Sequence, residues 1–226
     1  MGEKEVMTAD ISRLIDEIDT LPRDWHTAGA ATGRHLQAIA AHAQKIVDLR
    51  HSAETGSGKT TVLFSHLSPH HLVFAMEGGG SISQVQSSPL FDSRSVTYIE
   101  GPSQLTLPRY HFSHELQIVL IDGPHAYPFP DLEYYCFYPH ISTGGLLLID
   151  DIQIPTIARM YEILKADAMW ELLEVVEGMA FLRRTPVRGV GPFSEGWWVQ
   201  GYNASYYREY LAGLESQVPP SGKGAS

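Results

Sequence analysis

The chain has a single cysteine, Cys136, among its 226 residues, so no intrachain disulfide can form. It lacks any apolar run near the roughly 18–20 residues that a membrane-spanning helix needs. Its first residues, Met1–Met7, are polar and charged and offer no apolar core for a secretion signal. These absences fit a reducing compartment and no membrane partner, and we expect a cytoplasmic protein.

Positive charge is scarce as well. The 16 lysines and arginines are outnumbered by 26 aspartates and glutamates, which gives a formal net charge of −10. A negative surface disfavours non-specific binding to nucleic acid and to anionic lipid, and the densest basic pair is only Arg183-Arg184. We therefore expect no nucleic-acid partner. The N-terminal segment and Trp197-Trp198 could supply the contact of a homo-oligomer.

Apolar runs alternate with helical patterns through most of the chain. The predicted strands are Arg50–Ala53, which is short and poorly marked, Leu72–Met76, Val96–Ile99, Gln117–Ile121 and Gly145–Ile149. The predicted helices cover residues 8–20, 33–48, 61–67, 81–87, 131–138, 155–166 and 203–215. A hairpin is expected from Glu171–Val176 and Met179–Arg183, around Glu177-Gly178. The pattern predicts an α/β fold: a doubly wound, Rossmann-like, mostly parallel sheet with helices on both faces and a C-terminal antiparallel hairpin.

A glycine-rich turn, Glu54–Thr60, follows the first strand. A phosphate-binding P-loop would use Lys59 as a charge clamp and Asp150 on a partner strand, but Ala53 stands where its first glycine belongs. A dinucleotide fingerprint would need a third glycine, and Thr61 occupies that position. The interpretation that we favour is a nucleoside cofactor whose amino-acid tail lies over the two glycines of the turn.

Acidic residues end three of the predicted strands. Glu77 follows the strand after the glycine turn, where a carboxylate could accept hydrogen bonds from both vicinal hydroxyls of a ribose. Asp122 and the pair Asp150-Asp151 end two later strands. Because ligands bind at the carboxyl ends of strands in an open α/β sheet, these acids predict one cleft beside the glycine turn.

A histidine belongs to the same constellation. The Gly-Pro turn after Asp122 brings His125 back over the strand ends, where a carboxylate and an imidazole could share one substrate hydroxyl. Asp150 and Asp151 repel each other unless a cation or a proton is shared, and with Asp122 they could form an all-oxygen Mg²⁺ site. Alternatively, Asp151 caps the helix near Pro155 and only Asp150 faces the cleft.

With these motifs, the chain resembles the class I S-adenosylmethionine-dependent methyltransferases. It is most similar to the branch of metal-dependent sugar O-methyltransferases of macrolide biosynthesis and their cephalosporin-hydroxylase-like relatives. The resemblance covers about residues 50–184 and is carried by Glu54–Gly58, Ile121–Tyr127 and Gly144–Asp151. It implies S-adenosylmethionine as cofactor and Mg²⁺ as a second one.

The resemblance also implies roles for single residues. The implied cofactor contacts are Glu54, Gly56 and Gly58 for the methionine part, Glu77 for the ribose, Gly101 and Ser103 for the adenine, and Asp122. The implied metal ligands are Asp122, Asp150 and Asp151, and the implied general base is His125. The sequence departs from the branch at Asp150, where a glutamate is usual, and at Lys59, where a small residue is usual.

The resemblance implies O-methylation of a hydroxylated small molecule, such as a sugar or a natural-product intermediate. We expect an N-terminal helical extension (1–49), a catalytic domain that binds S-adenosylmethionine (50–184), an aromatic-rich extension (185–218) and a disordered tail (219–226). Three alternatives stay open: a P-loop nucleotide hydrolase using Lys59 and Asp150, a non-catalytic cofactor-binding scaffold, and a methyltransferase that uses no metal.

Overall fold

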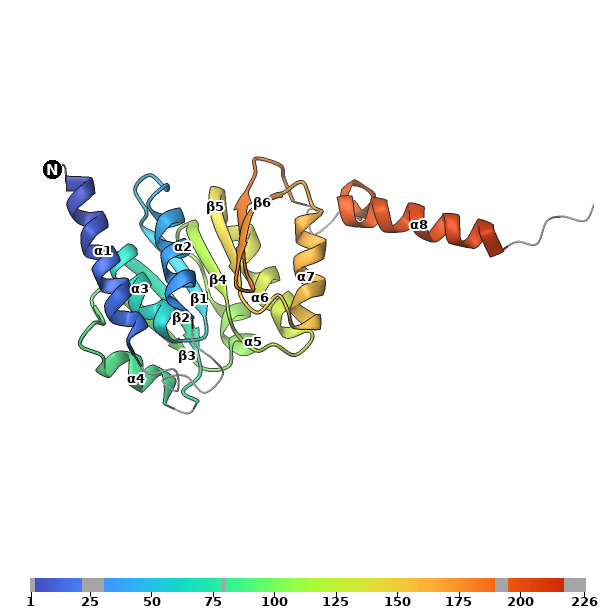
Figure 1. Ribbon diagram of the computed structural model, residues 1–226. Coiled ribbons are helices and arrows are strands. Elements are labelled where there is room, and N and C mark those ends of the chain that lie inside the picture. Colours follow the sequence, from blue (N-terminus) through green and yellow to red (C-terminus); the bar gives the residue numbers. More distant parts are fainter. Residues whose placement is uncertain (1–2, 22–30, 79, 190–194, 218–226) are drawn as a thin grey trace, which may run out of the picture.

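The computed structural model describes residues 3–21, 31–78, 80–189 and 195–217, and a seven-stranded sheet forms its centre (Figure 1). The strands are β1 (His51–Thr55), β2 (His70–Ala75), β3 (Val96–Glu100), β4 (Leu116–Ile121), β5 (Ile141–Ile149), β6 (Trp170–Val176) and β7 (Met179–Arg184). Their order is β3-β2-β1-β4-β5-β7-β6. The strands from β3 to β5 pair in parallel, whereas β7 is antiparallel to both β5 and β6. The predicted fold, with its closing hairpin, is therefore confirmed.

Helices cover both faces of this sheet. They are α1 (Glu3–Asp19), α2 (Gly33–Ala43), α3 (Lys59–Leu67), α4 (Ser81–Ser87), α5 (Ser103–Thr106), α6 (Phe129–Phe137), α7 (Pro155–Lys165) and α8 (Gly201–Gln217), with 3-10 turns at Leu107–Arg109, Tyr138–His140 and Trp197–Val199. Because successive strand residues point to opposite faces, β4 divides its apolar side chains between two cores. Ile118 and Leu120 pack under α1, α2 and α3, and Val119 and Ile121 pack under α6 and α7.

The central strand β1 has the most polar sequence of the parallel strands. It pairs with both β2 and β4, so both of its edges are hydrogen-bonded. Ser52 and Glu54 are buried on one face, and Ala53 and Thr55 are buried on the other. Hydrogen bonds to neighbouring side chains satisfy the buried polar groups, which explains how a strand without an apolar pattern occupies the middle of the sheet.

Several element boundaries differ from the prediction: α1, for example, begins at Glu3 rather than at residue 8, and two other differences have a visible backbone cause. The second helix was expected to reach residue 48 but ends at Ala43, and Asp48 has a φ of +53°, which a right-handed helix does not contain. The fifth strand starts at Ile141 rather than at Gly145. The strand continues through Gly144, whose φ of +84° is irregular for a strand but is readily adopted by glycine.

The two terminal extensions attach differently to the sheet. α1 and α2 bring Ile15, Ile18 and Leu36 into the core. α8 points away from the sheet in Figure 1, and its Tyr206 and Tyr210 are exposed. The expected disordered tail, 219–226, lies outside the described residues. No helix within the described ranges combines the length and apolarity that are required to cross a bilayer.

Candidate active site

A cavity of about 330 Å³ opens at the carboxyl ends of the parallel strands. Its lining includes Gly56 and Ser57 after β1, Met76 and Gly78 after β2, Pro102, Ser103 and Gln104 after β3, Asp122, Gly123, Pro124 and His125 after β4, and Asp150 and Asp151 after β5. Five different strand ends thus meet at one site, as expected for a ligand cleft in an open α/β sheet.

Gly56 forms part of the cavity wall for a steric reason. Its φ of +84° lies in the left-handed region, and a Cβ at this position would overlap the carbonyl oxygen of Asp122. Its amide donates a hydrogen bond to the Phe74 carbonyl at 3.1 Å. The close approach of the β1 and β4 ends therefore requires glycine, and it leaves a backbone surface on which a ligand can rest.

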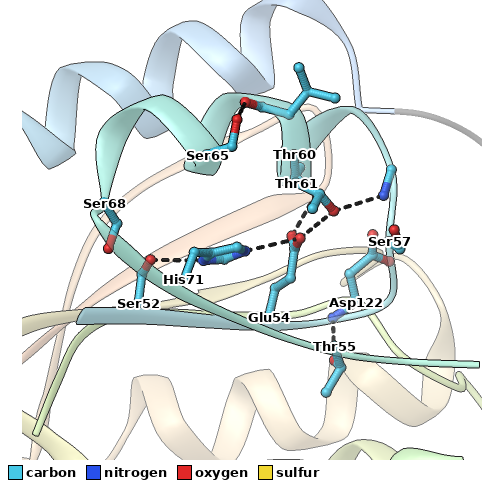
Figure 2. Close-up of polar contacts among 12 residues, drawn as sticks. Ser52, Glu54, Thr55, Ser57, Thr60, Thr61, Ser65, Ser68, His71 and Asp122 are labelled. Carbon is cyan, nitrogen blue, oxygen red and sulfur yellow. Dashed lines mark hydrogen bonds and ion pairs between the residues drawn. The ribbon is translucent and has the colours of Figure 1, made fainter. Parts of the chain in front are cut away.

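Glu54 faces away from the cavity and joins a buried hydrogen-bond network (Figure 2). Its carboxylate accepts hydrogen bonds from Thr60 Oγ1 at 2.7 Å and from Thr61 Oγ1, and it contacts His71 Nε2 at 3.1 Å. His71 Nδ1 in turn lies 2.8 Å from Ser52 Oγ. The network fastens the first turn of α3 to β1 and β2, so Glu54 supports the glycine turn from behind.

Lys59 is also directed away from the cavity. Its buried ammonium donates to the main-chain carbonyls of Leu21, at 3.0 Å, and Asp19, at 3.4 Å. A P-loop lysine must instead reach phosphates in front of the turn. The geometry therefore does not favour a P-loop hydrolase.

Asp122, His125 and Asp151 form a compact cluster in the cavity wall, with one ligand atom of each within 4.8 Å of the others. His125 Nε2 lies 3.1 Å from Asp151 Oδ2 and 3.9 Å from Asp122 Oδ1. Enclosure by protein raises the pKa of Asp122 to about 7, with the charge of Asp150 adding to the rise and His125 opposing it. The interaction with Asp122 raises the pKa of His125 most, and the charges of Asp151 and Asp150 add to that rise.

Asp150 lines the same cavity without joining this cluster. Its Oδ1 accepts a hydrogen bond from the Asp151 amide at 2.8 Å, where the backbone of Asp151 has a φ of +56°. This turn directs the Asp151 carboxylate towards His125. Of the three carboxylates expected to bind metal, the structure therefore groups Asp122 and Asp151 with the histidine and places Asp150 beside them.

The residues expected to contact a cofactor are divided between the cavity wall and its surroundings. Gly56, Ser103 and Asp122 line the cavity, whereas Gly58, Glu77 and Gly101 do not. Glu77 is exposed, and its Oε2 accepts a hydrogen bond from the Ser83 amide at 3.1 Å.

A match to a protein-family model shows the family to which the chain belongs. Residues 26–152, more than half of the chain, match the family model described as "Methyltransferase domain". The chain belongs to this methyltransferase family. The match spans the glycine turn, the Asp122–His125 segment and Asp150–Asp151, which are the parts of the sequence that form the cavity.

Solved structures share the methyltransferase fold at low sequence identity. The O-methyltransferase NovP is 17% identical, with 81% of this chain and 100% of NovP covered and a TM-score of 0.58. MycE, a methyltransferase from the mycinamycin biosynthetic pathway in complex with Mg, SAH and mycinamycin VI, is 14% identical, with 81% of this chain and 57% of MycE covered and a TM-score of 0.52. An rRNA methylase from Streptococcus thermophilus is 13% identical, with 67% and 96% covered and a TM-score of 0.50. Among the curated proteins, none matches the chain.

The methyltransferase cavity also contains residues that the sequence pattern did not indicate. His35 from α2 and Glu177 from the β6–β7 turn line it. His35 Nε2 lies 3.0 Å from the Val176 carbonyl, and Thr32 Oγ1 donates to Glu177 at 2.6 Å. The only local signal was the pairing of Thr32 with His35 at the start of α2, which form a capping box.

A second buried carboxyl group lies behind the methyltransferase cavity. Glu133 on α6 is fully buried and accepts hydrogen bonds from Ser103 Oγ at 2.6 Å and from Thr55 Oγ1 at 2.9 Å. Burial raises the pKa of Glu133 to about 7, against the opposing effect of these two hydrogen bonds.

Proposed function

We propose that this methyltransferase transfers the methyl group of S-adenosylmethionine to a hydroxyl oxygen of a small molecule, such as a sugar or a natural-product intermediate. The observation that carries the proposal is the cluster of His125, Asp122 and Asp151 in the same cavity as the Gly56 turn. A sulfonium methyl group is already electrophilic, so the enzyme has to align the acceptor oxygen behind it and exclude water. The cluster adds a proton acceptor and negative charge at that place.

In the proposed cofactor orientation, the methionine part lies over Gly56 and Gly58, the ribose at Glu77 and the adenine at Gly101 and Ser103. The backbone of Gly56 supports this orientation because it leaves no side chain between β1 and the ligand. Glu54, buried behind the turn, supports it through hydrogen bonds to the start of α3.

The residues present fit a hard divalent cation. Asp122 and Asp151 would hold Mg²⁺ through carboxylate oxygens, the ligands that this ion prefers, with Asp150 beside them. Burial, and to a smaller extent the charge of Asp150, raise the pKa of Asp122, and a positive ion beside it would favour its ionised form. When bound, Mg²⁺ would supply Lewis acidity that lowers the pKa of the acceptor hydroxyl.

His125 would accept the proton of the acceptor hydroxyl at Nε2, the ring nitrogen that faces Asp122 and Asp151. Nε2 is buried and has no hydrogen-bond partner among the described residues, so it can accept a proton, and the two carboxylates would stabilise the charged ring after proton transfer. The net charge of −10 supports a small acceptor over a polyanion such as RNA. The fold itself does not choose, because it also occurs in an rRNA methylase.

The first test is thermal stabilisation of the purified protein by S-adenosylhomocysteine and by ATP, each with and without Mg²⁺. A ligand that binds only the folded state raises the melting temperature in proportion to the logarithm of its concentration over Kd. We expect a shift with S-adenosylhomocysteine and none with ATP. A shift with Mg-ATP alone would overturn the proposal.

The metal part is tested on the same samples. Mg²⁺ alone is expected to raise the melting temperature of the wild type but not that of Asp151→Asn, which removes one negative ligand and keeps the side-chain shape. Equal shifts in both proteins would contradict a metal site at this cluster. The methyltransferase would then rely on His125 without a metal.

A further inference from the structure

Glu133 has no part in the proposed mechanism, although it lies directly behind the cavity. Its carboxylate is fully buried and takes hydrogen bonds from two hydroxyl groups that belong to different strand ends. Thr55 ends β1, and Ser103 begins α5 just after β3. A buried carboxylate with two such partners holds both in fixed positions, because leaving either group unpaired in the interior is costly.

The same carboxylate also packs against the end of β4. A Cβ at Gly123 would overlap the Glu133 carboxylate, so a larger residue at this position would have to displace that side chain. Thr55 Oγ1 accepts a hydrogen bond from the Asp122 amide at 3.0 Å while it donates to Glu133 (Figure 2 shows the Thr55–Asp122 contact). Glu133 thus connects three of the loops that form the cavity wall.

The hydrogen bonds of Ser103 determine the direction of its hydroxyl proton. A hydroxyl group has one proton and two lone pairs, and an ionised carboxylate can only accept. Ser103 Oγ lies 2.6 Å from Glu133 Oε1 and 3.4 Å from Gln104 Oε1, and the shorter contact directs its proton to the Glu133 carboxylate. Its lone pairs then remain for a ligand in the cavity that Ser103 lines. Pro102, next to Ser103 in the chain, also lines the cavity and adds apolar atoms to its wall, as does Phe74.

We propose that Glu133 is a positioning residue that holds Ser103 as a hydrogen-bond acceptor at the base end of the cofactor site. The site thereby selects a base that presents an amino group, such as adenine, over one that presents a carbonyl oxygen at the same position. This inference rests on the proposed function, because it assumes that the adenine of the cofactor lies at Ser103.

The test compares two ligands that differ only in this group, S-adenosylhomocysteine and S-inosylhomocysteine, by isothermal titration calorimetry at pH 8. The wild type is expected to bind the adenosine form at least about tenfold more tightly, because the inosine oxygen would face the lone pairs of Ser103. In Glu133→Gln, Thr55 already accepts from the Asp122 amide, so the new amide NH₂ faces Ser103 instead. The Ser103 proton is then released from position 133 and can turn to Gln104 Oε1 or into the cavity, where it can donate to the inosine oxygen. The preference should therefore fall to about one to threefold.

The ratio of the two Kd values distinguishes a role of Glu133 in orienting Ser103 from a general role in stabilising the cavity. A damaged cavity would weaken the binding of both ligands equally and leave the ratio unchanged. Asp131→Asn, the same acid-to-amide change on the same helix, is the matched control and should keep the wild-type ratio. An unchanged ratio in Glu133→Gln would overturn the inference.

Ser103→Ala provides a second route if Glu133→Gln fails to fold. It removes the acceptor with a small change in volume, so the ratio should again fall towards one, and a preserved ratio would overturn the inference. A wild type that binds neither ligand would contradict the proposed function itself. A wild type that binds both equally would leave the proposed function standing and overturn only the role of Glu133.

Discussion

His125 faces two carboxylates with the same ring nitrogen, Nε2, and their negative charges favour its protonated form. Asp151 Oδ2 is 3.1 Å from Nε2, while Asp122 raises the pKa of the ring. A histidine raised in this way binds a proton readily, which suits a group that must hold one after methyl transfer. The same environment means that His125 works as a base only above its raised pKa.

Replacing His125 with alanine should lower kcat by about 10²–10⁴-fold, the usual contribution of a general base. The cofactor is expected to keep its affinity within about threefold, because none of its proposed contacts uses this residue. The measurement combines initial rates on an acceptor found by screening hydroxylated small molecules with calorimetry of S-adenosylhomocysteine. His111→Ala, an exposed histidine outside the cavity lining, is the control. Wild-type turnover in His125→Ala would remove this residue from the mechanism.

The sequence allowed Asp122, His125 and Asp151 to be predicted together, because the carboxyl ends of parallel strands meet at one edge. It did not reveal the direction of Glu54. The partners that turn this side chain inward, Thr60 and His71, come from α3 and β2 and meet it only in the folded protein.

At the scale of elements, the N-terminal helices are fastened to the glycine turn by polar contacts. Lys59, the first residue of α3, donates to the carbonyls of Asp19 and Leu21 at the end of α1. The Asp19 carboxylate accepts a hydrogen bond from the Gly33 amide, at 2.8 Å, where α2 begins. Three helices therefore share one junction beside the candidate cofactor turn, and the N-terminal extension is part of the structural core.

Lys59→Met should destabilise the protein by about 1–3 kcal/mol, because the two carbonyl groups would lose a charged donor while the apolar stem is kept. Urea unfolding followed by circular dichroism measures this change. Lys45→Met, the same substitution at an exposed lysine, should change stability by less than about 0.5 kcal/mol. Equal effects of the two substitutions would show that the Lys59 contacts add nothing to stability. Loss of ATP-induced stabilisation in Lys59→Met would point to a P-loop instead.

Elements with strong apolar patterns were predicted well, and those held by polar contacts were not. The apolar runs of β2, β4 and β5 identified strands because both of their faces are covered. β1 gave almost no signal, since its buried Ser52 and Glu54 are satisfied by side chains from elsewhere in the chain. α2 ends at Ala43, and the positive φ of Asp48, which no helical spacing indicates, excludes a regular helix that reaches residue 48.

At the scale of the whole molecule, acidic residues dominate the charge and gather at the cavity. The pKa of Asp122 and that of Glu133 are both raised to about 7, mainly by burial, and the pKa of Asp150 is raised for the same reason. An acid whose pKa is higher in the folded state keeps its proton there at a pH where the unfolded chain has released it. At these acids the folded protein therefore binds more protons than the unfolded chain does near neutral pH. Burial lowers the pKa of His51 and that of His140, which act in the opposite direction, and we expect the more numerous raised groups to dominate.

The stability of the ligand-free protein should consequently fall as the pH rises. For each raised acid, the stabilisation is complete below its ordinary pKa, 3.8 for aspartate and 4.5 for glutamate, and is lost as the pH passes through about 7. His125 acts in the same direction, because its pKa is also raised. Urea unfolding should give a higher free energy of unfolding at pH 5.5 than at pH 8.

Glu133→Gln is the variant that tests this explanation, because glutamine cannot titrate. The raised pKa of Glu133 corresponds to on the order of 3 kcal/mol as an upper bound, so the variant should show a flatter pH dependence by up to this amount. Asp131→Asn on the same helix is the comparison: burial also raises the pKa of Asp131, but less than that of Glu133, so this variant should flatten the pH dependence less. If wild-type stability instead rises from pH 5.5 to 8, the buried acids are ionised in the folded protein at low pH. Favourable contacts of the ionised carboxylates at the strand ends would then outweigh the free-energy cost of burying their charges.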